Sequence, residues 1–180
     1  MTPQAFIDAV FDEQRAAFAS LDAGALDALA GELDRARRVF LYGIGRTGLA
    51  VQGFAMRLAQ CGIDAHFVGQ LSAPPAGPGD LYLSAVALGS LPTADAIAAA
   101  ARRSGARIAT ITARPERVPD VDLVVRLSAQ TMADPPASVL PLGSPFELAL
   151  HLLFEHLCLV LMKRRGLDAA ALGARHANIL

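Results

Sequence analysis

Three glycines and two polar side chains form the first candidate site, in the segment VFLYGIGRTGLAVQGF. Gly43, Gly45 and Gly48 have the spacing G-x-G-x-x-G, between an apolar run typical of a buried strand and a helix expected to begin near Thr47. A glycine-rich turn in this position presents backbone N–H groups and the positive end of a helix dipole to an anion. Arg46 and Thr47 add a cation and a hydroxyl, which suit a compact phosphate monoester.

A dinucleotide is the alternative ligand for this glycine spacing. That interpretation needs an acidic residue about 20 residues further on, at the end of the second strand, to hold the ribose hydroxyls. The expected second strand, AHFVGQ, ends at Gly69 and Gln70, and Asp64 precedes it. The sequence therefore favours a phosphate group on a smaller molecule.

A second turn, LGSLPTAD, follows the third expected strand and carries hydroxyls at Ser90 and Thr93. Either hydroxyl could be the N-cap of the helix that begins there, a role that stabilises a helix by about 1 kcal/mol. The turn taken alone favours this cap. Two strand-to-helix turns on one rim, each with hydroxyls and free N–H groups, would instead form a pocket for one phosphate.

Glu147 lies in LPLGSPFELAL, in the first turn of the longest expected helix, with Ser144 in the capping position. A glutamate three residues after a serine can satisfy the N-cap amide, so the spacing alone fits a capping box. The functional alternative is a general base at the edge of the pocket. Both interpretations stay open on these residues.

The remaining titratable side chains give weaker signals. Glu147, His151 and Glu155 share one helix face at the spacing i, i+4, i+8. Such a stripe without ligands from another element is typical of a salt-linked or interface face, so we expect no metal site. His176 lies near the end of the chain in RHANIL, where a histidine is usually a solvated bystander, and His66 within a strand is interpreted as structural.

Apolar periodicity and turn residues predict the elements that position these side chains. The expected helices are 3–19, 23–37, 47–61, 92–103, 145–165 and a short final helix after Gly166. The expected strands are 38–42, 65–68, LYLSAVAL, ARIATIT and DLVVRLS. Strands alternating with helices of 10–15 residues predict an α/β fold, with a five-stranded parallel sheet flanked by helices in three flavodoxin-like layers. We expect one domain over 1–180, with N-terminal helices over 1–37 and an α/β core with C-terminal helices over 38–180.

Ligands of such sheets bind beyond the carboxyl ends of the strands. This rule places residues 46–48, 88–93 and 129–146 on one rim. The last of these segments is long, irregular and proline-bearing, so the sequence predicts its position and not its conformation.

Composition excludes several classes of protein. The net charge is −1 and the 16 basic residues are dispersed, so we expect no nucleic-acid partner. Apolar residues make up 53% of the chain, which favours self-association of a soluble protein. Cys61 and Cys158 are too few for a disulfide framework, and the N-terminus lacks the pattern of a signal peptide. No uninterrupted apolar run is long enough to span a bilayer, so we expect a cytoplasmic protein without a membrane partner.

Four segments together resemble the sugar isomerase (SIS) domain family and, within it, the 6-phospho-3-hexuloisomerases. They are FLYGIGRTG, FAMRLAQCGIDAHFVG, LPLGSPFE and the terminal KRRGLD with RHANIL, and the resemblance covers almost the whole chain. The first is general to SIS domains, whereas the last two are specific to the isomerase group. The resemblance implies a sugar-phosphate ligand held by Ser/Thr-rich turns, and assembly as a homodimer or homotetramer.

The resemblance also implies roles for individual residues. Gly45, Arg46 and Thr47 stand in the first phosphate turn, and Glu147 matches the catalytic carboxylate. His176 matches a second catalytic residue, delivered to a neighbouring subunit's pocket. The second phosphate turn contributes Gly89, Ser90 and Thr93. The implied reaction interconverts 3-hexulose 6-phosphate and fructose 6-phosphate through an enediolate, with no metal or organic cofactor.

The second turn departs from the family pattern, which reads Ser-Gly-Ser-Gly-x-Thr. Leu88 removes a hydroxyl, Leu91 removes backbone freedom and Pro92 removes a donor N–H. Two alternatives to the 3-hexulose reaction therefore stay open: isomerisation of a different sugar phosphate, and a non-catalytic SIS module that binds a sugar phosphate as a sensor.

Overall fold

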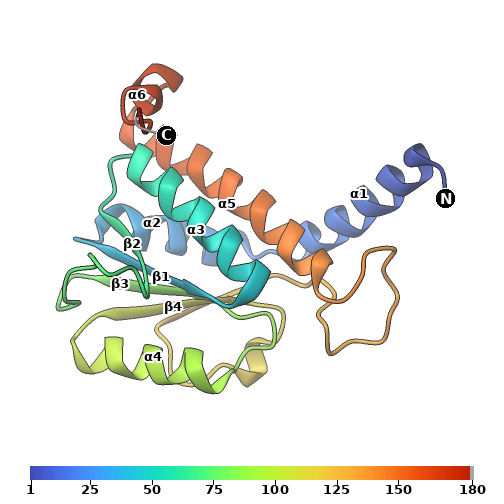
Figure 1. The fold of residues 1–180 in the computed structure, drawn as a ribbon, viewed down its shortest axis with the longest axis horizontal. Helices are drawn as coiled ribbons and strands as arrows, with labels where there is room; N and C mark the ends of the chain where they lie inside the picture. Colours follow the sequence, from blue (N-terminus) through green and yellow to red (C-terminus); the bar gives the residue numbers. More distant parts are fainter. Residues whose placement is uncertain (179–180) are drawn as a thin grey trace.

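Five parallel strands form one sheet in the computed structural model, which describes residues 1–178 (Figure 1). The strand order is β2-β1-β3-β4-β5, so the winding of the chain reverses between β1 and β3. Val39 of β1 lies opposite Ala65 of β2 and Leu81 of β3, so the carboxyl ends of the strands share one edge. The strands are β1 (Val39–Gly43), β2 (Ala65–Phe67), β3 (Leu81–Ala85), β4 (Arg107–Thr112) and β5 (Leu123–Arg126).

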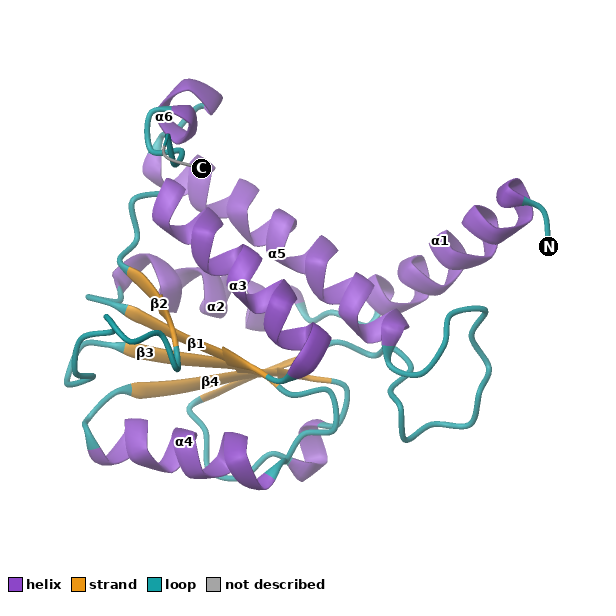
Figure 2. Cartoon of the chain, viewed as in Figure 1, coloured by secondary structure: helices purple, strands orange, loops and turns teal. Residues whose placement is uncertain are grey.

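Helices cover both faces of the sheet, unequally (Figure 2). One face carries α2, α3 and α5, whereas α4 lies on the other. The C-terminal half of α1 packs against α5, and its N-terminal half projects away from the rest of the protein (Figure 1). The helices are α1 (Pro3–Ala19), α2 (Ala23–Arg35), α3 (Gly45–Gln60), α4 (Pro92–Arg103), α5 (Ser144–Arg165) and α6 (Ala169–Gly173), with a short 3₁₀ turn, η1 (Pro115–Arg117).

The predicted fold class, the five strands and the six helices are confirmed, and the differences lie at element ends. Helix α3 begins at Gly45 instead of near Thr47, because the Gly48 amide already donates to the Ile44 carbonyl and closes the first turn. Strand β3 ends at Ala85 and not at Leu88, because the Gly89 amide turns back to the Val86 carbonyl. The 3₁₀ turn η1 was not predicted.

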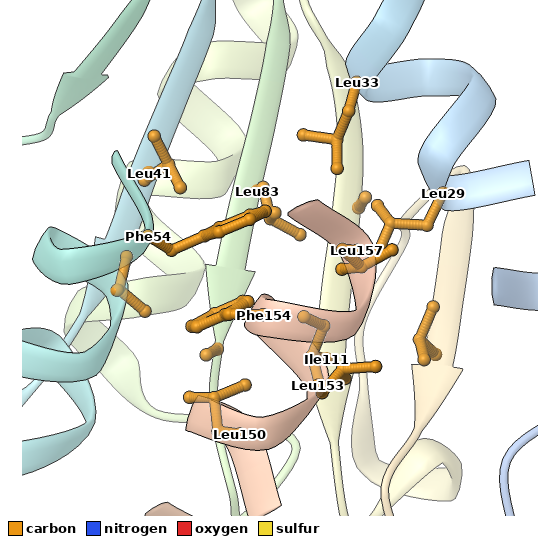
Figure 3. Close-up of a cluster of buried hydrophobic side chains, with 14 of the residues drawn as sticks. Leu29, Leu33, Leu41, Phe54, Leu83, Ile111, Leu150, Leu153, Phe154 and Leu157 are labelled. Atoms are coloured by element: carbon orange, nitrogen blue, oxygen red, sulfur yellow. The ribbon is translucent and has the colours of Figure 1, made fainter. Parts of the chain in front are cut away.

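The strands read as apolar runs because helices cover both of their faces. All five residues of β3 are buried, and β1 is nearly as enclosed. The larger core lies between the sheet and α3 and α5, where Leu41 and Leu83 face Phe54 and Phe154 (Figure 3). The two phenylalanine rings stack with centroids 4.2 Å apart and planes at 3°. This stack fixes α3 beside α5, and therefore fixes the two helix starts that flank the candidate site.

Helix α5 contains a long apolar stretch. By length and composition it could cross a membrane, yet half of its most apolar stretch is buried inside the protein. Its buried positions recur on one face, including Leu150, Leu153, Leu157 and Leu161, and this face packs in the core. The central helix of a soluble α/β protein has the same composition.

Candidate functional site

A cavity of about 410 Å³ opens at the carboxyl ends of β1 and β3, where the strand order reverses. Its walls come from the turn after β1, the turn after β3, and the loop that leads into α5. The structure thus brings together the three segments predicted to share a rim. The lining residues are Ile44, Gly45, Arg46, Thr47, Ala85, Val86, Ala87, Leu88, Leu91, Met132, Pro141, Leu142, Gly143, Ser144 and Glu147.

The glycine turn forms the floor of the cavity, and its glycines have distinct roles. A Cβ on Gly48 would lie 2.6 Å from the Gly43 carbonyl oxygen, so these glycines let α3 pack tightly against the end of β1. A Cβ on Gly45 would meet nothing within 4 Å, so close packing does not require this glycine. Its φ is 59°, and the turn therefore requires glycine here for its backbone conformation. The first backbone bond of the helix is Gly48 N–H to Ile44 O at 3.2 Å. The N–H groups before it have no intrahelical acceptor, which makes this end of α3 suited to an anion.

Glu147 enters the same cavity from the first turn of α5. Its side chain is 17% exposed and forms an ion pair with Arg46, which is 72% exposed. The carboxylate is therefore held beside the glycine turn by a guanidinium at the cavity mouth. The N-cap of α5 is Gly143, which makes no side-chain cap, and Ser144 is the first helical residue. The capping-box interpretation of Ser144 and Glu147 is thus wrong, and Glu147 is available to the cavity.

The second turn is arranged differently from the first. Ser90 donates its hydroxyl hydrogen bond to Asp95 at 2.5 Å, and Thr93 is exposed. Gly89 has a φ of 83° and packs so closely on the backbone of Arg114 that a side chain could not fit. None of these three predicted ligands lines the cavity; Gly89 lines a separate one between α4 and the sheet.

The alternative role of Ser90 and Thr93 as helix caps is also wrong. The N-cap of α4 is Leu91, which makes no side-chain cap bond, and Pro92 follows at the first helical position. Leu88 and Leu91 line the cavity where hydroxyls were expected. This side of the cavity is therefore apolar.

His176 lies at the opposite end of the protein from Glu147. The neighbouring Arg175 donates to the Gln60 carbonyl at 3.2 Å, at the C-terminal end of α3, whereas Arg46 and Glu147 meet at its N-terminal end. A helix of 16 residues is about 24 Å long, so these two predicted catalytic residues cannot meet within one chain.

The loop between β5 and α5 lies on the rim as predicted, and it supplies an apolar wall that the sequence analysis did not assign to particular side chains. Met132 and Leu142 line the cavity, and they are 68% and 73% exposed. Exposed apolar side chains at a cavity mouth are typical of a surface that binds a ligand or another protein. The position of the segment after the fifth expected strand predicted its place on the rim, but its irregular, proline-bearing sequence gave no conformation for Met132 or Leu142.

The helix stripe weighed as a metal site is a salt-linked face. Glu147 pairs with Arg46, Glu155 pairs with Arg57 at 3.3 Å, and His151 is exposed between them. Within residues 1–178, no group of three or more His, Cys, Asp or Glu side chains is placed to hold a metal ion.

Fold and cavity together define an α/β protein with a cavity at the switch point of a parallel sheet, the position where such folds bind small molecules. The chain matches no family model. It is 33% identical over 158 residues to the 3-hexulose-6-phosphate isomerase of Bacillus subtilis (strain 168), covering 85% of each chain. It is 32% identical over 176 residues to the enzyme of that name from Mycobacterium gastri, covering 94% of this chain and 87% of the relative.

A solved structure agrees with these relatives. A protein of Methanococcus jannaschii, whose structure infers a molecular function of 3-hexulose-6-phosphate isomerase, superposes with a TM-score of 0.83. It is 26% identical to this chain, and the match covers 97% of this chain and 98% of that one. The chain belongs to the sugar isomerase (SIS) domain family.

Proposed function

We propose that the chain is a phosphosugar isomerase that interconverts 3-hexulose 6-phosphate and fructose 6-phosphate. One observation carries the proposal: a largely buried carboxylate, Glu147, shares a cavity with the free N–H groups at the start of α3. This arrangement combines a proton-transferring group with an anion site at the same cavity. The relatives named 3-hexulose-6-phosphate isomerase support the same reaction.

The reaction follows from this arrangement. The phosphate binds at Gly45, Arg46 and Thr47, which leaves C2 and C3 of the sugar near Glu147. The carboxylate takes the proton from C2 of the 3-hexulose, and the C–H electron pair forms the C2–C3 double bond of an enediolate as the C3 carbonyl oxygen gains negative charge. The proton then returns to C3, while a proton moves from the C2 oxygen to the C3 oxygen and C2 becomes the carbonyl. Arg46 stabilises the enediolate charge from the cavity mouth.

His176 serves the sugar oxygens as acid–base partner, and it comes from a second copy of the chain. The separation of about 24 Å along α3 supports an assembly in which each site combines Glu147 of one chain with His176 of another. Phe6, Ile7 and Phe11 on the projecting part of α1 supply exposed apolar surface for such a homodimer or homotetramer. The assembly acts in the cytoplasm.

The second turn contributes Gly89, Ser90 and Thr93 when substrate binds. Ser90 must then exchange its bond to Asp95 for one to phosphate. This requirement, with the apolar lining at Leu88 and Leu91, favours a second candidate function: a non-catalytic module that binds a sugar phosphate.

The test measures two quantities with fructose 6-phosphate in deuterated water: conversion to the 3-hexulose, and exchange of the C3 proton by NMR. We expect both in the wild type, and a loss of at least about 100-fold in Glu147→Gln, because the amide cannot accept the proton. Glu155→Gln is the matched control, since this exposed carboxylate lies on the same helix and pairs with Arg57. Saturable binding without conversion or exchange in the wild type would instead support the non-catalytic module.

A further inference from the structure

Two consecutive residues of α1 bond to the segment that forms the outer wall of the cavity. Glu13 accepts a hydrogen bond from the Ser138 hydroxyl at 2.5 Å and another from the Val139 amide at 3.1 Å. Gln14, which is 3% exposed, donates from Nε2 to the Pro145 carbonyl oxygen at 3.4 Å. These bonds attach α1 to both ends of the stretch between Ser138 and Pro145.

That stretch builds one side of the cavity. Pro141, Leu142, Gly143 and Ser144 line it, and Glu147 follows in the first turn of α5. Leu142 has a φ of 54°, a left-handed conformation that a bulky side chain adopts only when its surroundings impose it. The backbone conformation of this wall therefore has to be maintained by contacts with residues outside the stretch.

Hydrogen bonds within the loop connect Glu13 to the residues that precede Leu142. The Ser138 hydroxyl donates to Glu13 and accepts from the Leu140 amide at 2.9 Å. Gln130 accepts from the Ser138 amide at 2.8 Å, which holds the other side of the loop. Figure 1 shows the loop, in orange, at the same end of the protein as α1, in blue. Glu13 is thus linked through one hydroxyl to the residues directly before the cavity wall.

We propose that Glu13 and Gln14 are positioning residues of the site: they fix the wall at Leu142 and the first turn of α5, and thereby set the affinity for the sugar phosphate. This inference rests on the proposed function for the identity of the ligand. Neither residue lines the cavity, so both act through the segment that does. Helix α1 therefore belongs to the site as well as to the surface that its exposed apolar residues form.

The test compares three variants of the full chain. Glu13→Ala removes both bonds to the loop, whereas Glu13→Gln keeps one acceptor oxygen for the Ser138 or Val139 donor. Asp12→Ala is the matched control, because this neighbouring exposed carboxylate bonds to Arg15 within the same helix. Thermal unfolding of all three variants checks that the fold is retained.

We expect Glu13→Ala to raise the KM for fructose 6-phosphate about tenfold with kcat within about twofold, because the wall holds substrate and transition state alike. Glu13→Gln should lie between Glu13→Ala and the wild type, and Asp12→Ala should match the wild type. Amide hydrogen exchange at Val139 and Leu140 should quicken about tenfold in Glu13→Ala. This readout shows whether the bonds hold the loop.

The outcomes separate this inference from the proposed reaction. Binding of fructose 6-phosphate without turnover, with Kd raised about tenfold in Glu13→Ala, would retain the positioning role and overturn the isomerase. Faster amide exchange with unchanged KM and Kd would overturn the positioning role and retain the isomerase. A loss of kcat equal to that of Glu147→Gln would also contradict it, because a positioning residue of the wall acts on binding.

Discussion

At the scale of single residues, the glycine spacing that suggested a dinucleotide has a packing explanation. Gly43 and Gly48 are needed because β1 and α3 approach so closely, and this requirement is independent of the ligand. The ligand class is instead indicated by Arg46, Thr47 and Glu147, which share the cavity. The glycines explain how the start of α3 comes to border the cavity, and the polar side chains indicate which kind of ligand suits that cavity.

Substitution of Gly48 by alanine tests this explanation. The added Cβ would lie 2.6 Å from the Gly43 carbonyl oxygen, so the strand–helix junction must move. We expect the free energy of unfolding to fall by about 1–3 kcal/mol, the usual effect of overpacking. Gly53→Ala is the control, because nothing lies within 4 Å of its Cβ position on the same helix. It should stabilise the protein by about 0.5–1 kcal/mol in urea unfolding, and an equal effect of both substitutions would refute the explanation.

At the scale of elements, an ion pair connects the turn that precedes β3 to the segment between α2 and β1. Arg37 donates two bonds to Asp80, at 2.9 and 2.8 Å, and the Gly77 amide donates a third at 2.8 Å. Burial raises the pKa of Asp80, but the bonds from Arg37 and Gly77 outweigh it and hold that pKa below its usual range. The ionised carboxylate thus joins two strand starts at the edge opposite the cavity.

Asp80→Asn should destabilise the protein in a pH-dependent way. The folded-state pKa of Asp80 is depressed, so its contribution is complete above the unfolded value of about 3.9 and is lost as the pH falls through the folded value. We expect the free energy of unfolding at pH 7 to be about 2 kcal/mol lower than in the wild type. As the pH falls into the acid range, the variant should lose less stability than the wild type does. Asp120→Asn is the control, because this carboxylate is largely exposed beside Arg102. If the free energy of unfolding of the variant were lower than that of the wild type by the same amount at every pH, the role assigned to the ionised Asp80 carboxylate would be wrong.

Sequence patterns predicted the helices and strands, but not the contacts between distant segments of the chain. Apolar runs and turn residues predicted all five strands, because each strand is rich in apolar residues and is bounded by local turn chemistry. The bonds that Ser138 donates to Glu13 and that Gln14 donates to Pro145 could not be predicted, because they join residues more than 120 positions apart. The caps expected at Ser90 and Ser144 failed for a related reason: Leu91 and Gly143 take the cap positions, so side-chain spacing alone did not fix the helix starts.

At the scale of the whole molecule, the two residues proposed as catalytic lie at opposite ends of one chain. Glu147 lies at the start of α3 and α5, and His176 lies beyond their far ends. The N-terminal half of α1 projects from the body of the protein (Figure 1), and helix α1 carries exposed apolar side chains, such as Phe6 and Phe11. A symmetric assembly would use this surface and bring the far end of one chain to the cavity of the next.

Subunit mixing tests this arrangement directly. Glu147→Gln and His176→Ala should each be inactive alone, because each site then lacks one catalytic group. If every site takes Glu147 from one chain and His176 from another, dissociating and reassembling an equal mixture gives about one quarter of sites with both groups intact. The mixture should therefore recover about 25% of wild-type turnover of fructose 6-phosphate, since a random neighbour supplies each half of the site. Variants mixed without dissociation are the control. Full inactivity after reassembly would place both groups in one chain, whereas an active His176→Ala alone would remove this histidine from the reaction.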